Sequence, residues 1–309
     1  MSSLSDAATD YLRLRNRLGH DLAEYHRLLP RFVAYLDQIG APTVTIATAL
    51  EWALAPDVDP ATSNPARRMT ITRRFAQHMA GLDPRTEIPP PGLISFHQRW
   101  HPPFIFTRAD LELLVTQAQR QVRGRLPAAT HSTMLGLLGA TGLRVGESIR
   151  LDRSDIDWID AVLLIRESKF GKSRLIPIRP SALAALQHYA DIRDEHHPKP
   201  STASFFVSIR GARMVYPTIH TVFRNLCCTT GIGASAPRPA RIHDLRHSFA
   251  VNTLLGWYRA GQDVEAKLPT LSTYMGHRDP RSTYWYLSAA PELLQLAAQR
   301  LEYSIETRS

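Results

Sequence analysis

The chain has 309 residues, of which 44% are hydrophobic and 21% charged, so it is long enough for two domains with buried cores and is not a mainly disordered protein. No apolar run reaches the ~18 residues of a membrane-spanning helix, and the N-terminus lacks the hydrophobic stretch of a secretion signal; we therefore expect a cytoplasmic protein without membrane contact. The net charge of +9 is typical of chains that bind polyanions such as nucleic acids, although an arginine-rich coding bias alone would produce the same excess.

The first 82 residues have the apolar spacing of helices. One periodic pattern runs from Leu12 to Leu36 and stops at Gly40, and two further helices are predicted at 43–55 and about 65–81. Four arginines lie on the last of these segments, and either a solvated face or contact with phosphates would explain them: Arg67, Arg68, Arg73 and Arg74. The sequence therefore predicts a helical N-terminal domain over residues 1–82.

A proline-rich segment follows at 83–103. Its six prolines cannot continue a helix and favour extended backbone, so we expect a linker there. Residues 104–309 then form a second domain, which holds most of the excess positive charge. The pattern predicts a capping box at Thr107–Asp110, a buried helix at 128–140, strands at 162–166, 175–178 and 204–208, and helices at 181–193, 217–229, 244–258 and after Pro291.

Two segments of the second domain carry basic residues at places where turns are expected. In TGLRVGE (141–147), Gly142 ends one helix and Arg144 opens the next, with Glu147 in its first turn. Taken alone, Arg144 is most simply interpreted as a surface residue or as the partner of a glutamate. The loop between the first two strands contains Lys169 and Lys172, and a basic turn would explain it. Only four of the 37 basic residues are lysines, however, and two of the four lie in this loop. Because lysine can release a proton where arginine cannot, a lysine here is a candidate general acid.

Two later segments contain histidines, arginine and tyrosines. In HDLRHSFA (243–250), His243 and Arg246 are three residues apart, so on a helix they share one face. Either they bind one oxyanion together, or the histidine caps the helix and the arginine forms a salt bridge. A Gly-His pair ends at His277 and precedes a tyrosine-rich helix with Tyr284 and Tyr286, which in isolation would be packing aromatics.

Taken in order, TGLRVGE, the hairpin lysine, HDLRHSFA, the Gly-His pair and a tyrosine nine residues after His277 resemble the tyrosine recombinases, or phage integrases, over residues from about 104 to 290. The resemblance implies a mainly α fold with a small β-sheet. A helical, SAM-like core-binding domain (1–82) and the linker (83–103) would precede a tyrosine recombinase catalytic domain (104–309). The stretch 251–277 is longer than in many family members, which leaves its helices undefined.

The resemblance also implies the roles of the site residues. Tyr286 corresponds to the nucleophile that forms a 3′-phosphotyrosyl bond and frees a 5′-hydroxyl; Tyr284 and Tyr274 lack its spacing from His277. Arg144 and Arg246 correspond to the arginines that bind the non-bridging phosphate oxygens, and Glu147 to a partner that orients them. The remaining assignments are Lys169 as the general acid, with Lys172 as the second choice, His243 as an aid to proton transfer, and His277 as a hydrogen-bond donor to the phosphate.

Such chemistry needs neither metal nor ATP, and the sequence contains no Walker loop and no carboxylate cluster for two metal ions. The expected partner is double-stranded DNA with inverted-repeat core sites, bound by a homotetramer alone or with a partner recombinase, during integration, excision or transposition of a mobile element. The apolar tail after Tyr286 would dock on a neighbouring subunit or on its own domain. Candidates for DNA contact are Arg67, Arg68, Arg73, Arg74, Lys172, Arg174 and Arg241.

Three alternatives remain open from the sequence. A type IB topoisomerase would use the same chemistry, and a DNA-binding accessory protein would use none. A metalloprotein would need a ligand cluster, whereas the thirteen histidines are scattered. The two cysteines are adjacent, which excludes a disulfide scaffold and indicates a reducing compartment.

Overall fold

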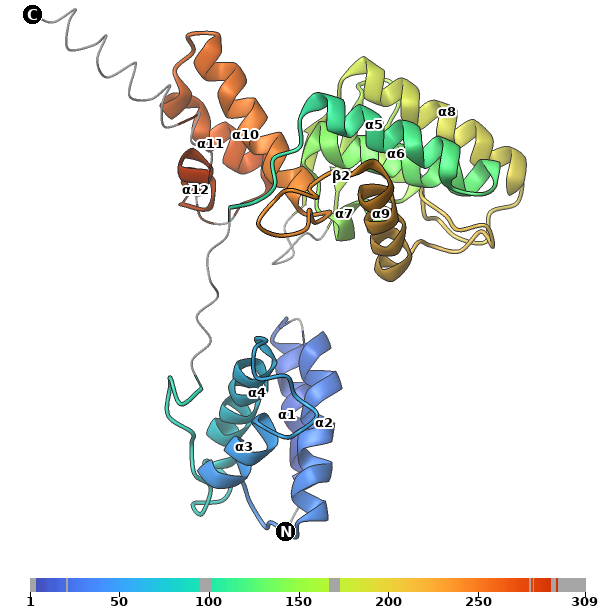
Figure 1. Ribbon diagram of the computed structural model, residues 1–309. Coiled ribbons are helices and arrows are strands. Elements are labelled where there is room, and N and C mark those ends of the chain that lie inside the picture. The colour runs from blue at the N-terminus through green and yellow to red at the C-terminus, as the bar shows by residue number, and fades with distance from the viewer. Residues whose placement is uncertain are drawn as a thin grey trace, which may run out of the picture. The chain divides into compact units, whose positions relative to one another are not determined.

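The computed structural model describes residues 4–20, 22–94, 102–166, 173–277, 279, 281–289 and 293, without the side chains of 281, 282, 288 and 289. The chain divides into two compact units, Met1–Trp100 and His101–Ser309 (Figure 1). The described residues are mostly helical with one three-stranded sheet, which confirms the predicted mainly α fold.

The first unit is built from four helices around one apolar core. They are α1 (Leu4–Arg17), α2 (Ala23–Gln38), α3 (Ile46–Ala53) and α4 (Asn64–Met79). Fully buried side chains such as Leu29, Phe32 and Phe75 join α2 to α4. Thr45 caps α3 by accepting a hydrogen bond from the backbone N–H of Thr48 at 3.1 Å.

The apolar pattern from Leu12 to Leu36 forms two helices rather than one. The break lies at Gly19, whose φ of 76° is left-handed and whose N–H donates to the carbonyl of Asn16 at 2.9 Å. Leu18, which the periodic pattern included, is exposed. Spacing alone did not detect the break, because apolar residues continue on both sides of a glycine that can reverse the chain.

The first part of the predicted linker packs on the helical unit. Arg73 donates hydrogen bonds to the carbonyls of Pro89 and Pro90 at 2.8 and 2.9 Å, and Thr86 pairs with Thr43 at 2.6 Å in a buried contact. The side chain of Ile94 reaches the core. Extended prolines leave their carbonyls free to accept hydrogen bonds, so a helix beside them can hold the segment.

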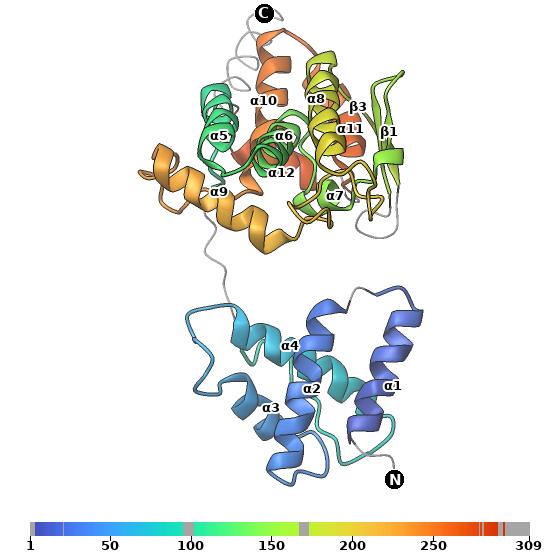
Figure 2. The same cartoon turned by 90° about the vertical axis from the view of Figure 1, so that its right-hand side faces the viewer.

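The second unit is arranged around α6, which Figure 2 shows at the centre of its helices. The helices and the short 3₁₀ turn before the sheet are α5 (Arg108–Gln121), α6 (Arg125–Thr141), α7 (Val145–Arg150), η1 (Arg153–Asp155), α8 (Pro180–His196), α9 (Tyr216–Thr230), α10 (Asp244–Arg259), α11 (Val264–Met275) and α12 (Arg281–Ala289). The predicted capping box at α5 is confirmed, since Thr107 and Asp110 bind each other's backbone N–H groups.

The sheet is antiparallel in the order β1–β2–β3, formed by β1 (Ile156–Asp157), β2 (Val162–Ile165) and β3 (Arg174–Pro177). Leu163 lies opposite Ile176, and both are fully buried. The strand predicted at 204–208 is wrong: this segment forms only isolated bridges, and Phe205 and Phe206 are core residues. A short apolar run can be buried without belonging to a sheet.

Helix α10 joins two apolar cores of the second unit. Leu245, near its N-terminus, belongs to the core around α6, whereas Val251 and Leu254 pack with α11 and α12 in a second core. Figure 1 shows α10, α11 and α12 as a lobe beside the layer formed by α5, α6 and α8. The first turn of α10 therefore lies where the two cores meet, and the candidate site lies there too.

Candidate active site

The turn between α6 and α7 positions Arg144. Gly142 ends α6, as the sequence predicted, and the structure places it in the left-handed conformation with a φ of 64°. Arg144 is the N-cap of α7 and pairs with Glu147: its backbone N–H donates to Oε2 at 3.0 Å, and its Nη1 donates to Oε1 at 2.7 Å. The predicted pairing of Arg144 with Glu147 is thus confirmed.

Arg246 lies in the first turn of α10 and is only 2% exposed. Its Nη1 donates to the carbonyl of Gly142 and its Nη2 to the carbonyl of Met275, both at 2.6 Å. Burial lowers the pKa of Arg246 to about 10, so it stays protonated at neutral pH. A guanidinium has five N–H donors, and these carbonyls therefore do not exhaust its capacity to bind an anion.

The C-terminal end of α11 is where the two arginines meet. Gly276 caps this helix with a φ of 67°, and its carbonyl accepts from Arg144 Nη2 at 3.2 Å, one residue after the carbonyl that Arg246 binds. The next residue, His277, is held by Thr283 of α12 through Nδ1 at 2.7 Å. The segments around 144, 246 and 277 are thus brought to one place.

Tyr286 lies beside this place on α12 and is 3% exposed. Its ring stacks on His277 with centroids 6.0 Å apart and also contacts His247 at 5.6 Å. Burial raises the pKa of Tyr286, whereas the charge of Arg246, its hydrogen bonding to the phenol, and the charge of Arg144 act in the opposite direction. The phenol is therefore protonated at rest and lies within the field of both guanidinium groups.

Three histidines of the site are uncharged at neutral pH, and the rings of His247 and His277 contact that of Tyr286. The pKa values of His243, His247 and His277 are each lowered to about 4, mainly by desolvation; for His243 and His277 the charge of Arg246 is the next largest cause. His243 keeps part of its surface in solvent, and its ring meets that of His247 edge-on at 4.9 Å. An uncharged imidazole keeps one ring nitrogen with a free lone pair, which can accept a hydrogen bond or a proton.

The structure brings together five of the six predicted catalytic residues, namely Arg144, His243, Arg246, His277 and Tyr286. Lys169 and the alternative Lys172 lie outside the described residues. The other tyrosines have different surroundings: Tyr284 is 45% exposed, and Tyr274 stacks on Phe249 while its hydroxyl donates to the carbonyl of Pro177 at 3.4 Å.

The arginines predicted to contact DNA fall into two groups. Arg68, Arg73 and Arg174 are engaged within the protein: Arg68 binds Asp57 and lies over Trp52, Arg73 binds the proline carbonyls, and Arg174 binds Glu147. Because these guanidinium groups already have internal partners, we no longer propose them as DNA contacts. Arg67, Arg74 and Arg241 remain candidates because their side chains are exposed, even though Arg67 and Arg241 form ion pairs with Glu24 and Asp244 at 3.5 and 3.4 Å.

Two residues around the site were not assigned by the sequence analysis. Asp244 is fully buried and accepts hydrogen bonds from Arg238 at 2.9 and 3.0 Å and from the backbone N–H of Arg241 at 2.9 Å, which anchors the start of α10. His247 lies between His243 and Tyr286, and its Nδ1 is buried without a hydrogen-bond partner among the described residues. The i, i+4 spacing of the two histidines could have indicated this contact.

Gly142 should be sensitive to substitution, because a Cβ there would lie 2.5 Å from Phe249 and the left-handed backbone would be strained. We expect Gly142→Ala to lower the free energy of unfolding by about 2–4 kcal/mol in urea denaturation. Gly231→Ala is the control, since Gly231 has a similar φ of 71° with no atom within 4 Å, and should cost about 1 kcal/mol. Equal losses would show that the contact with Phe249 is unimportant.

Within the described ranges, no helix is long and apolar enough to cross a membrane. In the same residues, no three His, Cys, Asp or Glu side chains gather as a metal site would require.

Comparison with known proteins supplies the remaining observation. A profile of the phage integrase family matches residues 106–292. The chain belongs to this family. It is a tyrosine recombinase, an enzyme that cleaves and rejoins DNA strands. The predicted resemblance is thereby confirmed.

Relatives agree with this assignment. The recombinase is 40% identical over the full length of both chains to the integrase/recombinase y4rB of Sinorhizobium fredii, and 27% identical to the tyrosine recombinase XerD of Caulobacter vibrioides over 90% of this chain and 82% of that one. Its fold resembles that of the Tn1549 transposon integrase in complex with transposon right-end DNA, with a TM-score of 0.67 at 18% identity over 98% and 99% of the two chains.

Proposed function

We propose that Tyr286 is the nucleophile of this recombinase. Its phenolic oxygen forms a bond to a DNA phosphorus while the bond from phosphorus to the 5′ oxygen breaks, so the strand ends as a 3′-phosphotyrosyl ester and a free 5′-hydroxyl. The phenolic proton passes to neutral His243, and Lys169 supplies the proton that the leaving 5′ oxygen takes up. Reversal of the step reseals a strand without ATP, because the ester retains the bond energy.

Arg144 and Arg246 would neutralise the two non-bridging oxygens of the phosphate. A planar guanidinium offers two parallel N–H donors to such oxygens, and in a buried site this interaction is strong. Both side chains already donate to carbonyl oxygens at the end of α11, at 3.2 and 2.6 Å, which is where an incoming phosphate oxygen would find donors. His277, fixed by Thr283, would bind the same phosphate.

One observation carries this proposal: the buried ring of Tyr286 stacks on His277, which directly follows the two carbonyls that Arg246 and Arg144 bind, although these residues come from segments far apart in the sequence. A phenol used only for packing does not require two arginines. The arrangement fits in-line attack on a phosphodiester.

The DNA partner follows from the family and from solved relatives in complex with DNA, such as the Tn1549 integrase. We propose that the helical unit 1–82 is a core-binding domain that acts with the catalytic domain, 104–309, on one half-site. Two protomers would bind an inverted repeat and two such sites a tetramer, in the cytoplasm, alone or with a partner recombinase. The substrate would be the end of a mobile element, in integration, excision or transposition. Exposed Arg67, Arg74 and Arg241 would contact phosphates.

The function is tested by incubating the wild-type protein with nicked DNA that carries its target site, so that a small fragment diffuses away after cleavage. We expect a covalent protein–DNA complex that survives denaturation in the presence of a metal chelator, with the Tyr286 peptide attached to a 3′ phosphate in mass spectrometry. No complex would overturn the proposal and favour a DNA-binding accessory protein. Relaxation of plasmid without any site, faster than recombination between paired sites, would indicate a type IB topoisomerase.

A further inference from the structure

Arg174, at the start of β3, forms three hydrogen bonds within the protein. It is 10% exposed, and its Nη1 and Nη2 donate to the two carboxylate oxygens of Glu147 at 3.0 and 2.9 Å. Its Nε donates to the carbonyl of Tyr274 at 2.9 Å. With its side chain mostly buried and three of its five N–H groups bound within the protein, Arg174 is placed to act inside the protein.

The first neighbour that Arg174 controls is Glu147. Oε1 accepts from Arg144 Nη1 at 2.7 Å and from Arg174 Nη1 at 3.0 Å, while Oε2 accepts from the Arg144 backbone N–H at 3.0 Å and from Arg174 Nη2 at 2.9 Å. Every oxygen of the carboxylate is thus shared between the two arginines. A displaced Arg174 would let Glu147 rotate, and Arg144 would move with it.

The second neighbour is the end of α11. Three consecutive carbonyls there are each bound by a different arginine: that of Tyr274 by Arg174, that of Met275 by Arg246 and that of Gly276 by Arg144. A Cβ on Gly276 would lie 2.9 Å from Cζ of Arg174, so the turn rests directly on this guanidinium. His277 follows the turn immediately.

We propose that Arg174 is a positioning residue for strand cleavage: by holding Glu147 and the end of α11 together, it sets the distance between Arg144 and the turn that carries His277. This inference rests on the proposed roles of Arg144 and His277. It replaces the expectation that Arg174 contacts DNA, and it predicts a loss of transition-state stabilisation rather than of DNA affinity.

The test compares Arg174→Lys and Arg174→Gln with the wild-type protein. Lysine keeps the charge but has no planar fork for Glu147, and glutamine keeps a donor without charge. With nicked target DNA at saturation, we expect the first-order rate of covalent complex formation to fall about 100-fold, and the dissociation constant for DNA to change less than about 3-fold.

A methylphosphonate at the scissile position tests whether the slower cleavage by the Arg174 variants arises from a displaced Arg144. It replaces one non-bridging oxygen by a methyl group, so the transition state carries less charge for the arginines to neutralise. We expect the ratio of wild-type to variant rates to fall from about 100 to about 10 or less on this substrate, because a displaced Arg144 then matters less. An unchanged ratio would identify a merely structural residue and overturn the proposal.

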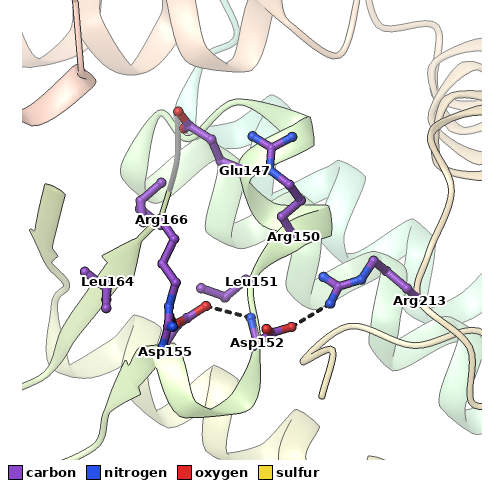
Figure 3. A pocket seen from close by; sticks show the side chains of 9 residues that line it. Glu147, Arg150, Leu151, Asp152, Asp155, Leu164, Arg166 and Arg213 are labelled. Carbon is purple, nitrogen blue, oxygen red and sulfur yellow. Dashed lines mark hydrogen bonds and ion pairs between the residues drawn. The ribbon is translucent and has the colours of Figure 1, made fainter. Parts of the chain in front are cut away.

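Arg166 provides the matched control: it follows β2 directly, whereas Arg174 begins β3, so the two arginines flank the same hairpin loop. Figure 3 shows Arg166 turned toward Asp155 and away from Glu147, along the wall of a cavity of about 460 Å³. Arg166→Gln should therefore leave the cleavage rate unchanged. Cleavage at the wild-type rate by both Arg174 variants would refute the positioning role. Weaker DNA binding with an unchanged cleavage rate at saturating DNA would refute it as well. If the wild-type protein itself formed no covalent complex with DNA, the proposed function would be refuted instead.

Gly276→Ala disturbs the same contact without changing a charge. The added Cβ would push the guanidinium of Arg174 away, so this variant should also cleave more slowly, and its methylphosphonate ratio should fall in the same manner. If the Arg174 variants fail to fold, this variant keeps the inference testable: wild-type cleavage by a folded Gly276→Ala protein would overturn it.

Discussion

Tyr286→Phe should bind target DNA as the wild-type protein does but form no covalent complex, with a loss of cleavage of at least about 10⁴-fold. The phenyl ring retains the contacts with His277 and His247, at centroid distances of 6.0 and 5.6 Å, and only the attacking oxygen is removed. The free energy of unfolding should change by about 1 kcal/mol or less, since one phenolic hydrogen bond is lost. Gel electrophoresis under denaturing conditions measures the complex, and urea titration measures the stability.

Two further tyrosines serve as controls for this variant. Tyr284→Phe changes an exposed residue, and Tyr274→Phe removes a hydroxyl whose partner is the carbonyl of Pro177, so both should retain cleavage. If Tyr286→Phe still formed a denaturation-resistant complex with DNA and one of the controls did not, the tyrosine changed in that control would be the nucleophile.

Glu147→Gln should have the largest effect on stability. Glu147 is 3% exposed and accepts hydrogen bonds from two guanidinium groups, so the neutral side chain leaves Arg144 and Arg174 without their counter-charge. Breaking a buried ion pair in this way costs about 3–5 kcal/mol. Glu112→Gln is the matched control because its ion pair with Arg108 is exposed, and it should cost about 0.5 kcal/mol or less. Similar losses in both variants would contradict the central position of Glu147.

The same carboxyl group predicts how stability depends on pH. Burial alone would raise the pKa of Glu147, but the hydrogen bonds and charges of Arg174 and Arg144 lower it from 4.5 to about 2. A carboxyl whose pKa is depressed in the folded state stabilises the protein above its unfolded pKa, so this contribution of about 3 kcal/mol is present at pH 7 and is lost between about pH 5 and pH 2. Urea denaturation at several pH values should show a smaller decrease over this interval for Glu147→Gln than for the wild-type protein.

Several local features could be predicted because their partners lie within a few residues. The capping box of Thr107 with Asp110, the helix end at Gly142 and the pairing of Arg144 with Glu147 all depend on spacings of three or four residues. The helix break at Gly19 could not be predicted in this way, because apolar periodicity continues across it. The buried run around Phe205 and Phe206 was misassigned for a related reason, since composition does not separate a core segment from a strand.

The sequence by itself determined the family, the order of the motifs and the set of side chains that the chemistry needs. Only the tertiary structure decided that Arg144 reaches the carbonyl of Gly276, 132 residues away, next to the Met275 carbonyl that Arg246 binds, so that both arginines meet at the end of α11. It also decided that Arg174 faces Glu147 and not solvent. Such contacts depend on how the two cores pack around α10, and a pattern of charges along the chain does not distinguish a buried arginine from an exposed one.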